Sequence, residues 1–203
     1  GAGNDTLAGG LGADTIFGIG RGLADAGDLL DYSYTNGVTT SVFGLTYDMI
    51  STSATVTIGA GDIDVIGRFM HVIGTRGSDS IVTDANQNFV NLGLGDDTVV
   101  GGSASDSFIG GAGNDVLDFS GQASNISVTL GGETAATVFV NGAENAVFRE
   151  FEGFVAGSGD DAIEGDVGAN TIIGNGGADT LSLNGGDDSA SGGLGADSLF
   201  GGD

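Results

Sequence analysis

The residues best suited to chemistry in this chain are aspartates that recur every nine positions. Two full series each hold four aspartates with an asparagine in second place, and the second series lies 82 residues after the first. Their members are Asp79, Asn88, Asp97, Asp106 and Asp115, and then Asp161, Asn170, Asp179, Asp188 and Asp197. A partial series at the start holds Asp5, Asp14 and, after a five-residue insertion, Asp28. Carboxylates repeated in this way offer oxygen ligands to hard cations.

The neighbours of these positions predict the structure that carries them. Glycines precede most of them, and glycine permits positive φ and a close approach of two backbones. An apolar residue follows two positions later, and only Ala190 is a weak member of that set: Leu7, Ile16, Leu30, Ile81, Val90, Val99, Phe108, Leu117, Ile163, Ile172, Leu181, Ala190 and Leu199. Each nonapeptide therefore reads as a turn followed by a three-residue strand with one side chain pointing inward.

Two nonapeptides make one 18-residue coil, so their strands lie on opposite faces and their apolar residues meet in a thin core. We expect an all-β fold, a parallel β-roll or β-helix solenoid with glycine-rich turns that bind calcium. Turns 18 residues apart would stack at about one strand spacing, roughly 4.8 Å. Carboxylates so close repel each other unless a cation lies between them. Calcium suits such a site because it accepts 6–8 oxygen ligands in flexible geometry, whereas magnesium demands a stricter arrangement.

The charge of the chain agrees with a cationic partner. It carries 28 acidic residues against 4 basic ones, a formal net charge of −24. Nucleic acid is excluded as a partner because the four arginines are scattered and cannot form the basic stripe that phosphates require. We expect no membrane span, since no apolar run approaches the roughly 18 residues that one needs.

The motif resembles the RTX family, also called the hemolysin-type calcium-binding repeat, most fully at residues 9–14, 110–115 and 192–197. This resemblance implies calcium held between turns of successive coils by motif aspartates and turn carbonyls. The implied same-side partners are Asp79 with Asp97, Asp97 with Asp115, Asn88 with Asp106, Asp161 with Asp179, Asp179 with Asp197, and Asn170 with Asp188. They suggest about six ions. The sites of Asn88 and Asn170 should be weaker or empty, because an asparagine offers a neutral oxygen.

The full set of metal ligands implied by the resemblance combines carboxylates with the main chain of the turns. The carboxylates are those of Asp5, Asp14, Asp28, Asp79, Asp97, Asp106, Asp115, Asp161, Asp179, Asp188 and Asp197. The turn main chain comes from Gly10, Gly12, Gly93, Gly95, Gly111, Gly113, Gly157, Gly159, Gly193 and Gly195. Asp96, Asp160 and Asp187 each precede a series aspartate, and are either additional ligands or solvated charges.

Repeat blocks alternate with stretches of different pattern. We expect a partial repeat block at 1–30, spacer coils at 31–73, a repeat block at 74–117, further spacer coils at 118–155, and a repeat block, truncated at its end, at 156–203. The spacers show alternating apolar residues, as in Ile126–Leu130, which predicts longer strands that continue the same solenoid with wider coils. Because the chain starts and stops inside a repeat, we interpret it as an excerpt of a longer protein.

No residue pattern in this chain predicts catalysis. The only histidine, His71, lacks the partners that a catalytic or zinc site needs, so it is assigned a structural or surface place. Glu150 and Glu152 form an acidic pair of the kind that glycosidases use. The aromatic residues are not arranged to bind a sugar, so hydrolysis is not expected.

Three functions are compatible with these features. The leading hypothesis is a module of a secreted bacterial protein that calcium folds and stabilises outside the cell, and the RTX resemblance further implies export by type I secretion. The second is a structural or adhesive extracellular protein, such as a surface-layer component, with end-to-end self-association of its rolls. The third is the non-catalytic repeat region of a secreted protease or polysaccharide-modifying enzyme, where the rest of the parent chain supplies the activity.

Overall fold

A computed structural model describes residues 71–83 and 85–202 in full, and the backbone of six earlier strands. These six are β1 (Thr6–Leu7), β2 (Thr15–Phe17), β3 (Leu29–Asp31), β4 (Thr46–Asp48), β5 (Ala54–Thr57) and β6 (Ile63–Gly67). The described residues form strands and turns with no helix, so the fold is all-β, as predicted. It follows that no membrane-spanning helix occurs in this part of the chain.

Fifteen further strands follow in the fully described region, most of them three residues long. They are β7 (His71–Ile73), β8 (Ser80–Val82), β9 (Phe89–Leu94), β10 (Thr98–Val100), β11 (Asp106–Ala112), β12 (Val116–Asp118), β13 (Ile126–Thr129), β14 (Ala136–Val140), β15 (Ala143–Arg149), β16 (Gly153–Val155), β17 (Ala162–Glu164), β18 (Thr171–Ile173), β19 (Thr180–Ser182), β20 (Ser189–Ser191) and β21 (Ser198–Phe200).

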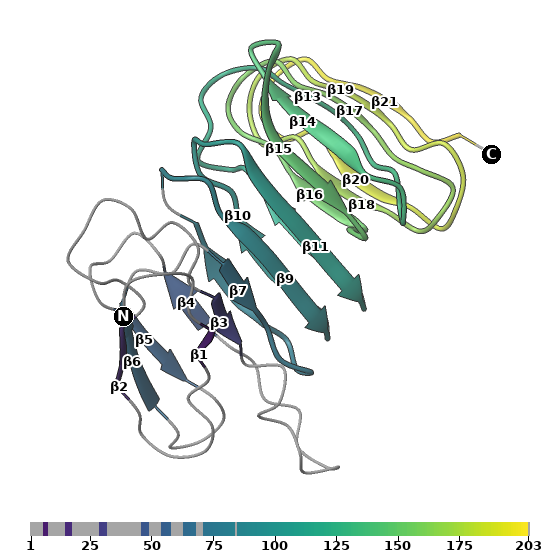
Figure 1. Cartoon of the computed structure of the whole chain (residues 1–203). Helices are drawn as coiled ribbons and strands as arrows, with labels where there is room; N and C mark the ends of the chain where they lie inside the picture. The colour runs from purple at the N-terminus through teal and green to yellow at the C-terminus, as the bar shows by residue number, and fades with distance from the viewer. Residues whose placement is uncertain are drawn as a thin grey trace.

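Successive strands of the repeat blocks belong alternately to two sheets. An eleven-stranded sheet, the long sheet, has the order β1-β3-β7-β9-β11-β15-β14-β13-β17-β19-β21, and a seven-stranded sheet, the short sheet, has the order β20-β18-β16-β12-β10-β8-β4. Strands one coil apart pair in parallel: Thr98 of β10 aligns with Ser80 of β8 and with Val116 of β12, 18 residues away on either side. Figure 1 shows the two layers, with β17, β19 and β21 in one and β18 and β20 in the other. The predicted parallel β-solenoid is confirmed.

The core between the two sheets is thin, because each sheet contributes one row of inward side chains, as the nine-residue pattern predicts. Most described repeat strands bury their inward residue, and the inward positions Ile81, Val90, Val99, Phe108, Leu117, Ile163, Ile172 and Leu181 are all nearly inaccessible to solvent. Ala190 is only partly buried. Leu199 is 46% exposed because it lies in β21, the edge strand of the long sheet. Burial of these two rows is the main apolar contribution to stability within the repeat blocks.

The stretch 118–155 adds strands unequally to the two sheets. In the long sheet three strands stand between β11 and β17, and β14 runs antiparallel to both β13 and β15. In the short sheet only β16 stands between β12 and β18. Aromatic residues fill this widened part of the core: Phe119 stacks on Phe154 at 5.9 Å and Phe148 meets Phe151 edge-on at 6.1 Å. The two repeat blocks are therefore joined through a meander in one sheet and a single strand in the other.

Candidate metal sites

The polar residues that precede the strands form two columns along the solenoid. The short-sheet column contains the residue just before each of the strands β8, β10, β12, β16, β18 and β20: Asp79, Asp97, Asp115, Glu152, Asn170 and Asp188. The long-sheet column contains those at the start of long-sheet strands: Asn88, Asp106, Asp161, Asp179 and Asp197. The two nine-residue series thus match in sequence but not in place. The uninterrupted aspartates of the first series lie beside the short sheet, and those of the second lie beside the long sheet.

Within each column, a carboxylate of one coil accepts the backbone N–H of the coil before it. Asp97 Oδ1 accepts from Asp79 N at 2.6 Å, and Asp115 Oδ1 accepts from Asp97 N at 2.9 Å. Asp179 Oδ1 and Asp197 Oδ1 accept from Asp161 N and Asp179 N at 2.9 Å and 3.0 Å.

The two pairs that contain an asparagine follow the same rule. Asp106 Oδ1 accepts from Asn88 N at 2.9 Å, and Asp188 Oδ1 accepts from Asn170 N at 2.8 Å. The structure therefore brings together the two members of each of the six same-side pairs named in the sequence analysis.

In five of the column aspartates, the second carboxylate oxygen, Oδ2, is available to bind a ligand. Asp97, Asp115, Asp161 and Asp179 are at most 2% exposed, and their Oδ2 atoms are buried without a hydrogen-bond partner, as is Oδ2 of Asp188. A buried polar atom left in this state costs free energy, and a buried charge costs more. A cation in contact with these oxygens would remove both costs.

The pKa values of the same groups report this environment. Burial raises the pKa of Asp97 to about 7, against the lowering effect of the Asp79 backbone N–H. Burial likewise raises the pKa values of Asp115 and Asp161 to about 6 and raises that of Asp179. Neighbouring carboxylates of the column add to each shift. The sites therefore disfavour the ionised form as long as no positive charge is present.

Main-chain carbonyls lie close to these Oδ2 atoms because glycine leaves room for them. A Cβ atom on Gly174 would come within 3.0 Å of both Asp179 Oδ2 and the Gly192 carbonyl oxygen. A Cβ on Gly110 would meet Asp115 Oδ2 and the Glu150 carbonyl oxygen in the same way. No three acidic or histidine side chains of the described residues share a site, so carbonyls would supply much of any coordination. A mixture of carboxylate and carbonyl oxygens suits calcium.

Most of the turn glycines predicted as backbone ligands have left-handed conformations. Gly93, Gly95, Gly111, Gly113, Gly193 and Gly195 have φ between 96° and 148°. A Cβ on Gly113 would collide with the Gly95 carbonyl oxygen of the coil before, so side-chain-free turns are needed for this stacking. Gly157 and Gly159 are buried, and a Cβ on Gly157 would collide with the Gln122 carbonyl oxygen. Asp5, Asp14, Asp28, Gly10 and Gly12 lie outside the described residues.

Two column positions have their polar groups satisfied inside their own turn. Asn170 Oδ1 accepts from Asp166 N at 2.9 Å, while Asn170 Nδ2 lies 3.3 Å from Asp166 Oδ1, to which it donates. The Asp79 carboxylate accepts from the backbone N–H of Thr75 at 2.7 Å and from its hydroxyl at 2.8 Å. Both arrangements reduce the need for a cation at these positions. The role of Thr75 was not anticipated from the sequence, although a hydroxyl four residues before the aspartate is a readable signal.

The residues before the column aspartates form an outer row of hydrogen bonds. Asp96 Oδ1 accepts from Asn114 N at 2.9 Å and Asp160 Oδ1 accepts from Ala178 N at 2.8 Å, both on the exposed surface. Asn125 Oδ1 continues the row by accepting from Asp160 N at 3.1 Å. These side chains therefore connect successive turns at the surface. Asp187 is exposed.

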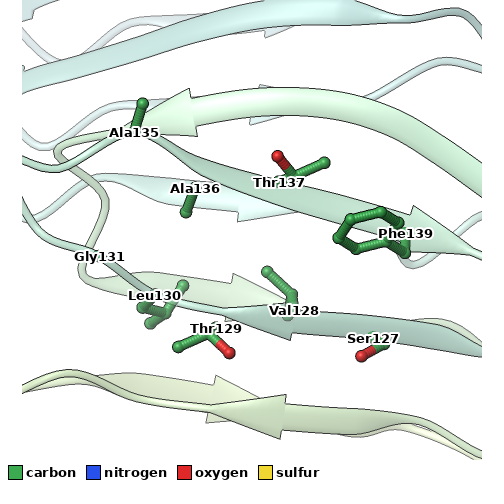
Figure 2. A pocket seen from close by; sticks show the side chains of 9 residues that line it. All are labelled: Ser127, Val128, Thr129, Leu130, Gly131, Ala135, Ala136, Thr137 and Phe139. Carbon is green, nitrogen blue, oxygen red and sulfur yellow. The ribbon is translucent and has the colours of Figure 1, made fainter.

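Two further features of the described residues lie outside the columns: His71 and a hollow on the spacer surface. His71 is half-buried, with its ring 6.0 Å from that of Phe89. Figure 2 shows a hollow on the spacer, between side chains such as Val128 of β13 and Phe139 of β14. It opens because β13 and β14 pair only at one end, where Ser127 aligns with Phe139. None of its nine lining residues is ionisable, so it offers a cation no charged ligand.

In a comparison with protein families, five stretches of this chain match one family model, described as the RTX calcium-binding nonapeptide repeat (4 copies). The matched residues are 1–18, 71–99, 92–124, 155–190 and 183–203. Residues 125–154, which hold the antiparallel meander, fall outside the match. No curated protein matches the chain.

Proposed function

Because the chain belongs to the RTX calcium-binding nonapeptide repeat family, and is a calcium-binding repeat protein in consequence, we propose that calcium drives its folding. One observation carries this proposal: Asp97, Asp115, Asp161, Asp179 and Asp188 each bury a carboxylate oxygen that has no hydrogen-bond partner within the protein. Each proposed ion lies between consecutive turns of a column and contacts a carboxylate and the nearby carbonyls. The six same-side partners then correspond to about six ions.

The energy of binding is of the size that folding requires. At ten times its dissociation constant, calcium at one site adds about 1.4 kcal/mol to the stability of the folded state. About six such sites would add roughly 8 kcal/mol, comparable with the total stability of about 5–15 kcal/mol of an ordinary domain. About twelve positive charges would also offset half of the −24 net charge. The thin core is then stabilised by ions rather than by its own apolar area.

This linkage would make folding depend on location. Weak calcium sites of extracellular modules have dissociation constants of roughly 10⁻⁴–10⁻³ M. Sites of this strength would stay vacant where calcium is scarce, as inside a cell, and fill outside it. Proteins of this family are typically secreted. We therefore place the folded form of this chain outside a bacterial cell, after export by type I secretion.

Circular dichroism in chelator and in calcium tests the proposal. We expect a disordered spectrum in chelator and a cooperative gain of β-signal at millimolar calcium, with little response to the same concentration of magnesium. A chain that is already β-rich in chelator, and whose melting temperature calcium does not raise, would show that the fold is independent of the ion.

A further inference from the structure

The short-sheet column crosses from the first repeat block to the second at Glu152. Strand β16 pairs with β12 and β18, with Gly153 aligned to Val116 and to Thr171. Glu152 therefore stands directly between Asp115 and Asn170 in the column. It lies 37 residues after Asp115, which is not a multiple of nine, so the repeat pattern of the sequence does not include it.

The contacts of Glu152 reproduce those of a repeat aspartate. Its Oε2 accepts from Asp115 N at 2.9 Å, just as Asp115 Oδ1 accepts from Asp97 N. The next backbone N–H, that of Gly153, donates to the Asp115 carbonyl at 2.8 Å, just as Val116 N donates to the Asp97 carbonyl. A glutamate thus occupies the aspartate position at the seam, which we define as the contact of residues 110–115 with residues 150–153.

The seam also has a buried oxygen that lacks a partner. Asp115 is fully buried, and its Oδ2 has no hydrogen-bond partner. Asp115 Oδ2 and the Glu150 carbonyl oxygen both lie next to the Cα of Gly110. A Cβ atom on Gly110 would come within 3.0 Å of both oxygens. The carboxylate of Glu150 forms an ion pair with Arg149 at 2.9 Å. That leaves the Glu150 carbonyl, rather than its side chain, to face Asp115.

We propose that Asp115 Oδ2, the Glu150 carbonyl and the Glu152 carboxylate bind a further calcium ion at the seam. The inference rests on the proposed function, since it extends the column of ions through a coil that is not a nonapeptide repeat. Two carboxylates and a carbonyl around a side-chain-free Cα form a hard oxygen site of the type calcium accepts. An ion here would join the two repeat blocks through the short sheet, beside the meander of the long sheet.

Glu152→Gln tests the site because glutamine keeps the acceptor for Asp115 N and removes the charge. Glu144→Gln, on the exposed face of β15, is the matched control. Calcium bound per chain is counted by equilibrium dialysis with radioactive calcium at saturation, and circular dichroism checks the fold in the same buffer. We expect one ion fewer in Glu152→Gln and the wild-type count in the control.

The outcomes separate this inference from the function on which it rests. A wild-type chain that binds no calcium refutes the proposed function itself. A wild-type chain that binds calcium, with an unchanged count and affinity in Glu152→Gln, refutes only the seam site.

If Glu152→Gln does not fold, Gly110→Ala decides instead. Its Cβ would collide with the Glu150 carbonyl oxygen and come within 3.0 Å of Asp115 Oδ2, so it would displace an ion held between them, whereas a Cβ on Gly121 would meet nothing within 4 Å. A Gly110→Ala chain with one ion fewer than Gly121→Ala supports the seam site, and equal counts overturn it.

Discussion

Replacing Asp97 by asparagine should have opposite effects on the calcium-free and the calcium-bound protein. Asp97 is 1% exposed, and one of its oxygens is buried without a partner. Asparagine keeps an oxygen that can accept from Asp79 N, the bond that Asp97 Oδ1 makes at 2.6 Å. The substitution therefore removes the buried charge while it preserves the link between the coils.

The size of the effect follows from the pKa of Asp97. Its rise from 3.8 to about 7 means that ionising this group at pH 8 costs the folded, calcium-free state at most about 4 kcal/mol. Solvent near the turn reduces this to about 2–3 kcal/mol. The new amide group offsets part of the gain, since a buried donor without a partner costs about 1–3 kcal/mol. We expect Asp97→Asn to stabilise the calcium-free folded state by about 0.5 kcal/mol, and by at most about 2 kcal/mol.

The calcium-bound state should change in the other direction. Asp97 stands between Asp79 and Asp115, so its carboxylate can serve the ions on both sides of its turn. The affinity of a calcium site depends on its number of charged ligands. The calcium concentration at the folding midpoint should therefore rise by about tenfold or more in Asp97→Asn.

Two titrations, each monitored by circular dichroism, measure the two effects. Trimethylamine N-oxide in chelator at pH 8 favours the compact state, and Asp97→Asn should fold at a lower concentration of it than the wild type. Calcium titration without the osmolyte gives the second midpoint. Asp118→Asn is the control, because Asp118 lies outside the columns and its carboxylate accepts a local hydrogen bond from Ser120 N at 2.7 Å. The account of the buried carboxylates would be wrong in either of two cases: if Asp97→Asn folded only at a higher osmolyte concentration than the wild type, or if its calcium midpoint equalled that of the wild type.

Three further predictions follow from the same sites. The folded-state pKa of Asp97 is raised, so its contribution to calcium-free stability is fully present below pH 3.8 and is lost as the pH rises through about 7. Lowering the pH from 8 to 5 in chelator should therefore increase the β-signal. A decrease would contradict the raised pKa of Asp97. Gly111→Ala should lower the melting temperature in calcium, because φ is 110° there and the Cβ would collide with a carbonyl oxygen, at a cost of about 1–2 kcal/mol, whereas Gly121→Ala should melt like the wild type. Asn170→Asp should lower the calcium midpoint by adding a charge beside Asp188, and an unchanged midpoint would show that this turn takes no ion.

The sequence determined the architecture because its signals are local. A nine-residue period with one apolar residue in each strand can be buried only by winding the chain into coils of two strands. The same period fixed which aspartates are 18 residues apart, and hence the six same-side partners. The turn glycines were also readable, since positions such as Gly111 must adopt a conformation that disfavours any side chain.

The tertiary structure decided how the two repeat blocks are joined. The nine-residue period does not predict that β13, β14 and β15 enter one sheet while β16 alone enters the other. Strand pairing across the spacer depends on contacts between residues distant in sequence. That pairing moves the unbroken aspartates from the short sheet to the long sheet, and it puts Glu152 in line with Asp115. Burial, too, is a property of the folded coil. It leaves carboxylate oxygens of the repeated aspartates without hydrogen-bond partners. These aspartates therefore favour binding of a cation, whereas solvated aspartates on a surface would not need one.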